Sequence, residues 1–380
     1  MQQQAIRFVL MRGGTSKCLI FKENDLPPVG GERDRLLLEA FGSPDPRQID
    51  GMGGATSLTS KACIIAPSER ADIDIDYTFG QVNILRPMVD YGGSCGNCSA
   101  AVGPFAIDEG LVRAREGITA VRILNRNTQK LIVAEVPVQN GHAQCEGDFE
   151  IAGVPGKGAL QRLWFYDPAG SITGRLLPSG HPSDLLEVQG SEIEISLVDA
   201  ANPVVFVRAR DIGLSGRESA AEIDSRPGVP QVLEEIRGKV AVMLGWVDEW
   251  QRAAAVTPGV PKIAMVAPVQ VDRHAGTSEQ VDFVARIMSM GRCHAAYALT
   301  GAIATGAAAH IPGSIVHGVR HPDRAERAIV QIGHPTGVID VDIETDTARD
   351  GAVRIVRAAG YRTARRIADG TLYMHHALER

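Results

Sequence analysis

The residues best suited to chemistry lie around Cys95, in the segment GGSCGNCSAAV over residues 92–102. A predicted strand over residues 88–91 leads into two glycines, the cysteine and then small residues that are typical of a helix start. A thiol at a helix N-terminus faces backbone N–H groups, which stabilise a thiolate and can also hold a carboxylate. We therefore predict a reactive Cys95 on a helix that Pro104 makes short or kinked.

The same segment allows other interpretations, because Cys98 follows Cys95 in a Cys-x-x-Cys spacing. Such a pair is typical of thiol–disulfide proteins, but the surrounding sequence lacks the βαβ pattern of a thioredoxin-like domain. It is also compatible with half of a zinc site, although zinc needs two further ligands and the sequence shows no second Cys-x-x-Cys and no paired histidines. A buried structural cysteine is the third alternative.

A second candidate, Lys61, ends the segment GMGGATSLTSK over residues 51–61. Hydroxyl side chains, including Ser57 and Ser60, crowd the approach to this lysine, and an apolar strand follows it. A lysine in such a place is predicted to be partly buried, and burial lowers the pKa of an ammonium group and makes it a usable base. The alternative is an exposed lysine at the start of a strand.

A third candidate is the glycine turn in MRGGTSK near the N-terminus. Gly13 and Gly14 let the backbone turn with positive φ and approach a ligand closely. Thr15 and Ser16 add hydroxyl donors and Arg12 adds charge, so the turn is predicted to cradle a carboxylate. A hairpin turn with solvated charges is the alternative interpretation.

Two further glycine turns in the second half carry histidines, in SMGRCH over residues 289–294 and in GHPTG over residues 333–337. A lone histidine is more often a satisfied hydrogen-bonding group than a catalyst, so we interpret these turns as lining for a site. The predicted lining residues of this half are Ser289, Met290, Gly291, His294, Thr300, Gly301 and His334.

The elements that position these residues are mostly short strands between turns rich in glycine and proline. Helices are predicted over residues 33–41 and 278–290. A hairpin is predicted from residues 6–10 and 19–21, and further strands over residues 61–66, 73–77, 120–124, 131–137 and 192–198. Many short strands with few helices favour a mixed or antiparallel sheet, and no glycine-rich nucleotide loop accompanies them.

The length of 380 residues suits two domains, and the turn residues over 179–184 place the boundary there, between residues 1–184 and 185–380. The net charge of −6 gives no reason to expect nucleic acid or an anionic membrane as a partner. Residues 294–318 contain no Asp, Glu, Lys or Arg, but their Ala, Gly and Thr content favours a buried helix over a membrane span. Six cysteines without a signal peptide favour free thiols in the cytoplasm.

Taken together, these segments resemble the family of methylitaconate and 2-methylaconitate isomerases and 4-oxalomesaconate tautomerases. The resemblance runs in one order along nearly the whole chain. It is carried by MRGGTSK, GSPDPRQIDGMGGATSLTSK, VDYGGSCGNCSAAVGPFAIDEGLV, GDFEI, PKIAMVAP, RIMSMGRCHAAYALTGAIATGAAAHIPG and GHPTG. The family is similar to diaminopimelate epimerase. This implies an α/β (α+β) fold of two similar domains, each a mixed or antiparallel sheet wrapped around a central helix. The site would lie in the cleft between them, and the last strand could return to the first domain.

The resemblance also implies roles for individual residues. Lys61 and Cys95 match the family's catalytic pair, whereas the place of an epimerase's second cysteine, near Thr300, holds none. This absence tells against racemisation by two thiols. Cys18, Ser94 and Cys98 stand where the family usually has glycine, asparagine and an aliphatic residue, which leaves the exact substrate open. The expected substrate-binding residues of the first half are Arg12, Gly13, Gly14, Thr15, Ser16, Ser57, Ser60, Gly96, Asn97, Cys98 and Ser99.

The resemblance thus implies an isomerase that needs no cofactor or metal and moves a proton across an allylic system in a small unsaturated di- or tricarboxylate. 4-Oxalomesaconate, methylaconitate, aconitate and methylitaconate are the candidate substrates. A thiol–disulfide protein and a non-catalytic partner of an aconitate hydratase are the alternatives. The expected partner is the polycarboxylate alone, with a homodimer left open.

Overall fold

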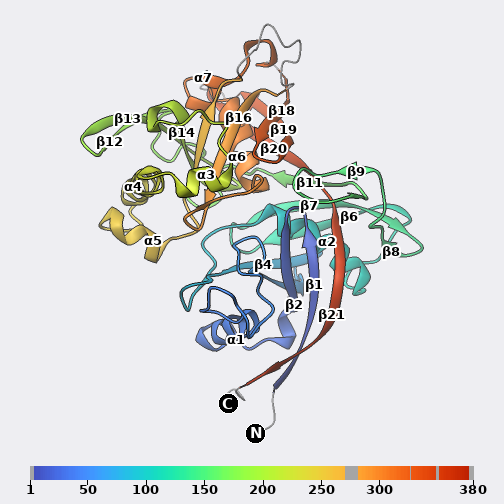
Figure 1. Ribbon diagram of the computed structural model, residues 1–380. Helices are drawn as coiled ribbons and strands as arrows, with labels where there is room; N and C mark the ends of the chain where they lie inside the picture. Colours follow the sequence, from blue (N-terminus) through green and yellow to red (C-terminus); the bar gives the residue numbers. More distant parts are fainter. Residues whose placement is uncertain (1–3, 270–280, 326, 348–350, 376–380) are drawn as a thin grey trace. The chain divides into compact units, whose positions relative to one another are not determined.

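The chain divides into two compact units in the computed structural model, which describes residues 4–269, 281–325, 327–347 and 351–375 (Figure 1). Unit 1 comprises Met1–Leu163 together with Arg362–Arg380, and unit 2 comprises Trp164–Tyr361. The last strand belongs to unit 1 because it pairs antiparallel with the first strand along its length.

The predicted boundary at residue 184 lies inside unit 2. The turn-rich segment before it is tied to that unit by the carboxylate of Asp199, which accepts hydrogen bonds from the backbone N–H groups of Ile172 and Thr173 at 2.9 and 2.7 Å. The turn residues that predicted a domain boundary therefore belong to a loop within unit 2. Hydrogen bonds decide which unit a loop joins, and the sequence does not reveal them.

Unit 1 is built on a mixed sheet, as its many short strands predicted. Neighbouring strands pair antiparallel except for β2 with β3 and β4 with β6, which are parallel. In spatial order these strands are β21 (Ala364–Met374), β1 (Gln4–Gly13), β2 (Ser16–Lys22), β3 (Lys61–Pro67), β4 (Ile75–Val82), β6 (Gly117–Asn125) and β7 (Lys130–Gln139). Shorter strands are β5 (Val89–Asp90), β8 (His142–Ala143), β9 (Phe149–Glu150), β10 (Lys157–Gly158) and β11 (Gln161–Tyr166), in which the division between the units falls.

The two faces of this sheet pack on different helices. Leu19 and Phe21 of β2 and Ala62 of β3 join a core with α1 (Gly31–Phe41), the helix predicted over residues 33–41. Strand residues alternate between faces, so Lys61 and Cys63 of β3 point to the opposite face, toward α2 (Gly96–Asp108). A short 3₁₀ turn, η1 (Glu23–Asp25), connects β2 toward α1.

Helix α2 is the central helix of unit 1. Its residues from Gly96 to Ile107 are all buried, and it contacts β1, β2, β3, β4, β6, β7, β8 and β21. Of the two predicted alternatives, a short helix was wrong, because α2 has 13 residues and continues past Pro104, and a kink at Pro104 stays a prediction. Pro104 removes one backbone hydrogen bond from its turn of α2, and the packing of α2 on all sides stabilises that turn.

Unit 2 repeats the strand arrangement of unit 1. Pairing is again antiparallel except for two parallel pairs, β14 with β15 and β16 with β18. The strands in spatial order are β12 (Asp184–Val188), β13 (Ser191–Ala200), β14 (Asn202–Arg208), β15 (Lys262–Ala267), β16 (Phe283–Ser289), β18 (Ile329–His334), β19 (Gly337–Thr347) and β20 (Val353–Arg362), with β17 (Arg292–Cys293) beside β16.

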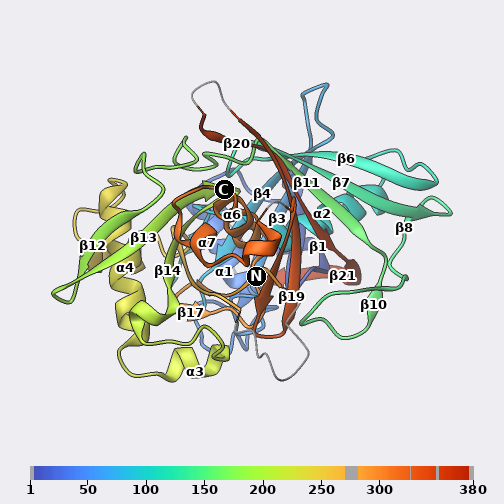
Figure 2. The ribbon, with the colours of Figure 1, turned by 90° about the horizontal axis from the view of Figure 1, so that it is seen from above.

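The central helix of unit 2 is α6 (Leu299–Ala309), every residue of which is buried. Figure 2 shows α6 with β14 on one side and β19 on the other, and both strands contact it. The remaining helical segments are η2 (Ala209–Ile212), α3 (Ala220–Ser225), α4 (Val229–Met243), η3 (Trp250–Arg252), α5 (Ala253–Val256), α7 (Ile315–Val319) and η4 (Pro322–Arg324). No helix among the described residues is both long and apolar enough to span a membrane.

The helix predicted over residues 278–290 is wrong where the structure describes it. Phe283–Ser289 forms β16, and residues 278–280 lie outside the described residues. Every residue from Phe283 to Met288 is buried, so the strand is covered on both faces. A short apolar run of this kind fits helical and strand spacing equally well, and the parallel neighbour β18 decided the outcome.

Candidate active site

Lys61 begins β3 and is held in place by a glutamine on the neighbouring strand. Its side chain is almost wholly buried, and Nζ donates to Oε1 of Gln81 at 2.6 Å. Gln81 is fixed in turn, since its Nε2 donates to the carbonyl oxygens of Ser60 at 2.9 Å and Ser57 at 3.2 Å. The predicted burial is therefore confirmed. Among the described residues, no carboxylate forms an ion pair with Lys61, which leaves it open to an anionic partner.

Cys95 is the N-cap of α2, where the sequence placed it. Its Sγ accepts a hydrogen bond from the backbone N–H of Cys98 at 3.4 Å and lies 4.0 Å from Oγ of Ser16. The residue as a whole is half-buried. Lys61 is close enough for its charge to act on the thiol.

The predicted stabilisation of a Cys95 thiolate is present but outweighed. The hydrogen bond between the Cys98 and Cys95 thiols and the burial of Cys95 raise the pKa of Cys95 well above its ordinary value. The Lys61 charge and the Cys98 backbone N–H oppose this rise and are weaker. The resting residue is therefore a neutral thiol, which can donate a proton.

The paired glycines near the N-terminus allow the β1–β2 hairpin to approach the first turn of α2. A side chain on Gly13 would place Cβ 2.3 Å from the carbonyl oxygen of Asn97. Gly14, with φ of +50°, would place its Cβ 2.3 Å from Oδ1 of the same asparagine. Both glycines thus allow close helix packing, and their predicted approach to a ligand stays a prediction.

Asn97 links the hairpin to a cation that sequence analysis missed. Its Nδ2 donates to Oγ1 of Thr15 at 2.9 Å, and its Oδ1 accepts from Nε of Arg362 at 2.8 Å. Arg362 is buried, and burial lowers its pKa to about 10, against the opposing influence of Cys95. No local motif could reveal this arginine, because it lies 265 positions from Asn97.

Several residues predicted to bind substrate have polar groups committed elsewhere. Nη1 of Arg12 donates to the carbonyl oxygens of Gly14 and Thr363 at 3.0 and 2.9 Å. Ser60 Oγ donates to Gln48 at 2.7 Å, and Ser99 Oγ donates to the carbonyl oxygen of Cys95 at 3.1 Å.

Three more of the predicted residues stand at the edge of this group. Ser57 contributes a carbonyl oxygen to Gln81, and Gly96 is the buried first residue of α2. Cys98 has no exposed surface and lies one turn deeper on α2, beneath Cys95. It therefore acts on the site through the Cys95 sulfur and has no surface to offer a substrate.

In unit 2, the predicted residues before α6 form a tight turn between β16 and β17. Met290 and Gly291 have φ of 54° and 77°, which is typical of a two-residue hairpin turn that begins after Ser289. His294 is buried, and its Nδ1 accepts from the backbone N–H of Ala296 at 3.0 Å. This contact defines the ring orientation and agrees with a lining role.

The other predicted residues of unit 2 lie at the start of α6 and the end of β18. Thr300 accepts from Nδ2 of Asn202 at 2.8 Å, and Gly301 leaves room for Ile287, whose Cδ1 would lie 2.4 Å from an added Cβ. His334 is buried, with Nδ1 3.4 Å from the backbone nitrogen of Thr336. These residues pack within unit 2.

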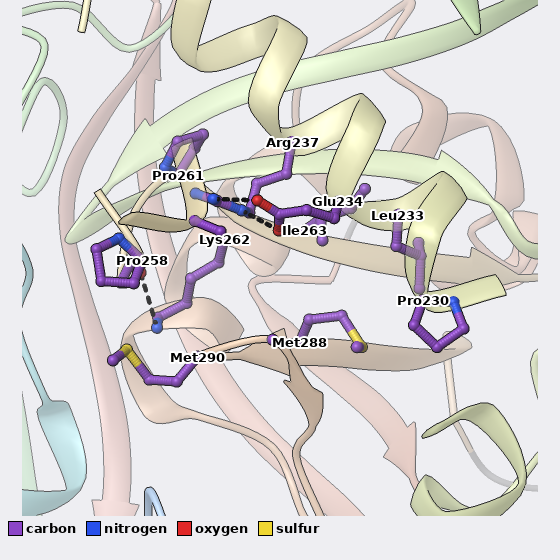
Figure 3. A pocket seen from close by; sticks show the side chains of 13 residues that line it. Pro230, Leu233, Glu234, Arg237, Pro258, Pro261, Lys262, Ile263, Met288 and Met290 are labelled. Atoms are coloured by element: carbon purple, nitrogen blue, oxygen red, sulfur yellow. Dashed lines mark hydrogen bonds and ion pairs between the residues drawn. The ribbon is translucent and has the colours of Figure 1, made fainter. Parts of the chain in front are cut away.

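A cavity of about 180 Å³ lies elsewhere in unit 2, between α4 and the start of β15 (Figure 3). Its charged groups are already paired: Arg237 donates to Glu234 at 2.8 and 2.5 Å, and Lys262 Nζ donates to the carbonyl oxygen of Gly259 at 3.2 Å. Met290 contributes to its wall. With its cations satisfied, this cavity offers packing space and no reactive pair.

Unit 1 therefore brings together a buried lysine, a neutral thiol at a helix N-terminus and a buried arginine. A lysine and a thiol can exchange protons with a carbon acid, and the cations with the helix N-terminus can hold carboxylates. On a fold of two similarly wound α/β units, these groups define a proton-transferring isomerase.

Comparison with known proteins identifies the family. The PrpF protein family matches residues 3–375, and the chain belongs to it. The 3-methylitaconate isomerase of Eubacterium barkeri is 46% identical, with 99% of this chain and 98% of that protein covered. The 2-methyl-aconitate isomerase of Shewanella oneidensis is 40% identical over 95% of this chain and 94% of its own. The 4-oxalomesaconate tautomerase of Pseudomonas putida is 39% identical over 98% and 97%.

Solved structures agree with this assignment. A methylitaconate-delta-isomerase crystal structure matches with a TM-score of 0.77 at 45% identity, covering 98% of this chain and 96% of that one. A hydroxyproline epimerase from Agrobacterium vitis matches with a TM-score of 0.60 at 12% identity, covering 100% of this chain and 95% of that chain, which shows a shared fold. The chain is an isomerase with the predicted epimerase-like fold, and the relatives give no support to a thiol–disulfide protein or an accessory role.

Proposed function

We propose that this isomerase moves a proton between two carbons of a small unsaturated di- or tricarboxylate, with Lys61 and Cys95 as its acid–base pair. The observation that carries the proposal is the placement of Lys61. It is buried, oriented by Gln81 and without an ion pair to a carboxylate among the described residues, and its charge reaches the Cys95 thiol. Such a pair serves a substrate that brings its own negative charge.

In the proposed reaction, neutral Lys61 removes a proton from the carbon next to the double bond. The electrons shift into the allylic system to form a dienolate, whose charge is stabilised by Arg362 and the N-terminus of α2. The Cys95 thiol then gives its proton to the carbon at the other end of the system. A proton passing from the lysine ammonium to the thiolate restores the pair, so that the two groups titrate together.

The raised pKa of Cys95 supports its assignment as the proton donor in this direction. Its neutral form is stabilised by Cys98 and by burial, so the thiol is protonated when substrate arrives. In the reverse reaction the roles exchange, because the same groups must serve both directions.

Methylitaconate, methylaconitate, aconitate and oxalomesaconate remain the candidate substrates. Relatives named for three different substrates match this chain at 46%, 40% and 39% identity, so similarity alone does not choose among them. All four compounds share the features that the site can use, which are carboxylates and an acidic proton next to a double bond.

The proposal is tested by incubating the enzyme with each candidate acid and following ultraviolet absorbance together with proton NMR in deuterium oxide. We expect a spectral change with one of them, and deuterium at the allylic carbon. Wild-type enzyme that produces neither signal with any unsaturated di- or tricarboxylate would refute the proposal.

We also propose a cytoplasmic location, which the state of the thiols supports. All six cysteines are free, and four of them are buried. Reduced thiols of this number suit a reducing compartment. Fractionation of cells that make the tagged protein tests this, and recovery from an extracytoplasmic fraction would contradict it.

A further inference from the structure

Three buried thiols lie directly beneath the catalytic cysteine of unit 1. Cys18 on β2, Cys63 on β3 and Cys98 on α2 have sulfur atoms that all lie within 4.8 Å of one another. Their side chains are between 0% and 1% exposed. Sequence analysis found only two sulfur ligands at the Cys-x-x-Cys spacing, and the fold supplies Cys18 and Cys63 from strands that are remote in the chain.

The position of this cluster follows from the register of the strands. Cys63 follows Lys61 by two residues on the same face of β3, and Cys98 follows Cys95 by about one turn of α2. The cluster is therefore the next layer of the core below the proposed acid–base pair. Ile20 stands beside Cys63 in the parallel pairing of β2 and β3, so Cys18 shares that face.

The equivalent layer of unit 2 shows that thiols are not needed for packing. Lys262 begins β15 as Lys61 begins β3, and Ala298 is the N-cap of α6 as Cys95 is of α2. Counting from these positions, the register places Val204, Ala264 and Gly301 where unit 1 has Cys18, Cys63 and Cys98. Valine, alanine and glycine occupy this layer in unit 2.

We propose that Cys18, Cys63 and Cys98 form a binding site for a soft, thiophilic metal ion, Cu(I) being the ion that the site fits best. Three sulfurs about 2.3 Å from a central ion in a plane stand about 4 Å apart, within the span of the cluster. Thiolates select Cu(I) and Zn(II) among biological ions, but structural zinc almost always takes four ligands. The three fully buried sulfurs leave no exposed position for water to serve as a fourth.

Binding of the ion changes the charge of this buried layer. Binding breaks three S–H bonds, forms three Cu–S bonds and releases three protons to solvent, with copper remaining Cu(I) throughout. The resulting site carries two negative charges. Arg362 is bound to Asn97, the neighbour of Cys98, and supplies a positive charge nearby.

The test is metal binding to the fully reduced protein without oxygen, with Cu(I) as the probe and Zn(II) in a parallel arm. We expect one Cu(I) per chain by equilibrium dialysis against a competing chelator, with a thiolate-to-copper charge-transfer band in the ultraviolet. Zn(II) should bind more weakly. Metal binding is measured without catalysis. The metal site can therefore be refuted while the proposed isomerase function stands, and the isomerase function can be refuted while the metal site stands.

The variants Cys18→Val and Cys63→Ala introduce the side chains that unit 2 has in this layer. Each should weaken Cu(I) binding at least about 10²-fold, because loss of even an outer partner of a metal costs about 10–100-fold. Cys95→Ser should keep the site, as should Cys293→Ala, which removes a buried cysteine of unit 2.

Binding that is lost in Cys95→Ser but kept in Cys63→Ala would overturn the proposal in favour of the Cys-x-x-Cys pair. Absence of tight Cu(I) binding to wild type would also overturn it and leave the thiols as packing. If a circular dichroism spectrum shows that Cys63→Ala is unfolded, Cys18→Val carries the same comparison on the other strand.

Discussion

Lys61 and Cys95 acquire their properties from neighbours that differ in kind. Gln81 orients the lysine through a neutral amide, and no carboxylate forms an ion pair with it among the residues that the structure describes. Cys98 acts on the Cys95 thiol in two ways. Its backbone N–H donates to the Cys95 sulfur, and its thiol raises the pKa of Cys95, which is the stronger effect. A lysine–thiol pair of this kind keeps one proton available and one site open for another, as a proton shift requires.

The first prediction at this scale concerns Lys61. Lys61→Ala should lower kcat by about 10² or more, because a positioned base is removed. Lys262→Ala is the matched control, since that lysine begins the equivalent strand of unit 2 and its Nζ donates to the carbonyl oxygen of Gly259. Steady-state kinetics on the substrate found in the screen measures both. A Lys61→Ala enzyme with more than about a third of wild-type kcat would rule this lysine out as the base.

The second prediction concerns the protonation of Cys95. Because its pKa is raised, little thiolate exists at neutral pH, and alkylation by iodoacetamide should be slow at pH 7 and accelerate as the pH rises above 9. The exposed Cys145 provides the comparison within the same molecule. Peptide mass spectrometry after timed alkylation measures each site. Faster modification of Cys95 than of Cys145 at pH 7 would show that the helix N-terminus dominates instead.

At the scale of elements, the site depends on how closely the β1–β2 hairpin approaches the first turn of α2. The carbonyl oxygen of Asn97 leaves no room for a side chain on Gly13, and the Asn97 side chain bridges the hairpin to Arg362. The helix start that positions Cys95 is thereby clamped from the strand side. Backbone atoms on both sides of this contact leave little scope for adjustment.

This contact leads to the third prediction. Gly13→Ala should lower the free energy of unfolding by about 1–3 kcal/mol, because the added methyl group would meet a backbone oxygen at 2.3 Å. Gly31→Ala is the control, since Gly31 begins α1 and an added Cβ would meet nothing within 4 Å. Urea unfolding followed by circular dichroism compares the two. Equal stability of both variants would mean that the hairpin can move away from α2 without cost.

At the scale of the whole molecule, the last strand of the chain pairs with the first. β21 pairs with β1 from Gln4–Met374 to Gly13–Ala364, and it brings Arg362 and Thr363 to the residues that the first hundred positions provide. Unit 1 is therefore complete only when the final segment has been added. Unit 2 is continuous in sequence between Trp164 and Tyr361.

The fourth prediction tests how much the pairing of β21 with β1 contributes to the stability of unit 1. Ala364→Glu places a charge at a buried position of β21 opposite Gly13, and should destabilise unit 1 by roughly 3 kcal/mol. Ile367→Glu is the matched control on the same strand, where the side chain is 44% exposed. Thermal unfolding with hydrogen exchange of unit 1 peptides measures the effect. Similar melting of both variants and wild type would contradict the importance of the C-terminal strand.

The sequence by itself determined the chemistry and much of the local structure. The β1–β2 hairpin, α1, the helix start at Cys95 and a buried Lys61 all follow from nearby residues, because turns, caps and apolar alternation act over a few positions. The likeness of motifs along the chain carried the family and the reaction class.

Only the tertiary structure decided which distant residues meet. It turned residues 283–289 into a strand, assigned the loop before residue 184 to unit 2 and brought Arg362 to Asn97. It also placed Cys18 and Cys63 beside Cys98, where the sequence had shown an isolated pair. Such contacts depend on strand order and register, which are set by packing over the whole core and leave no periodic signal in any one segment.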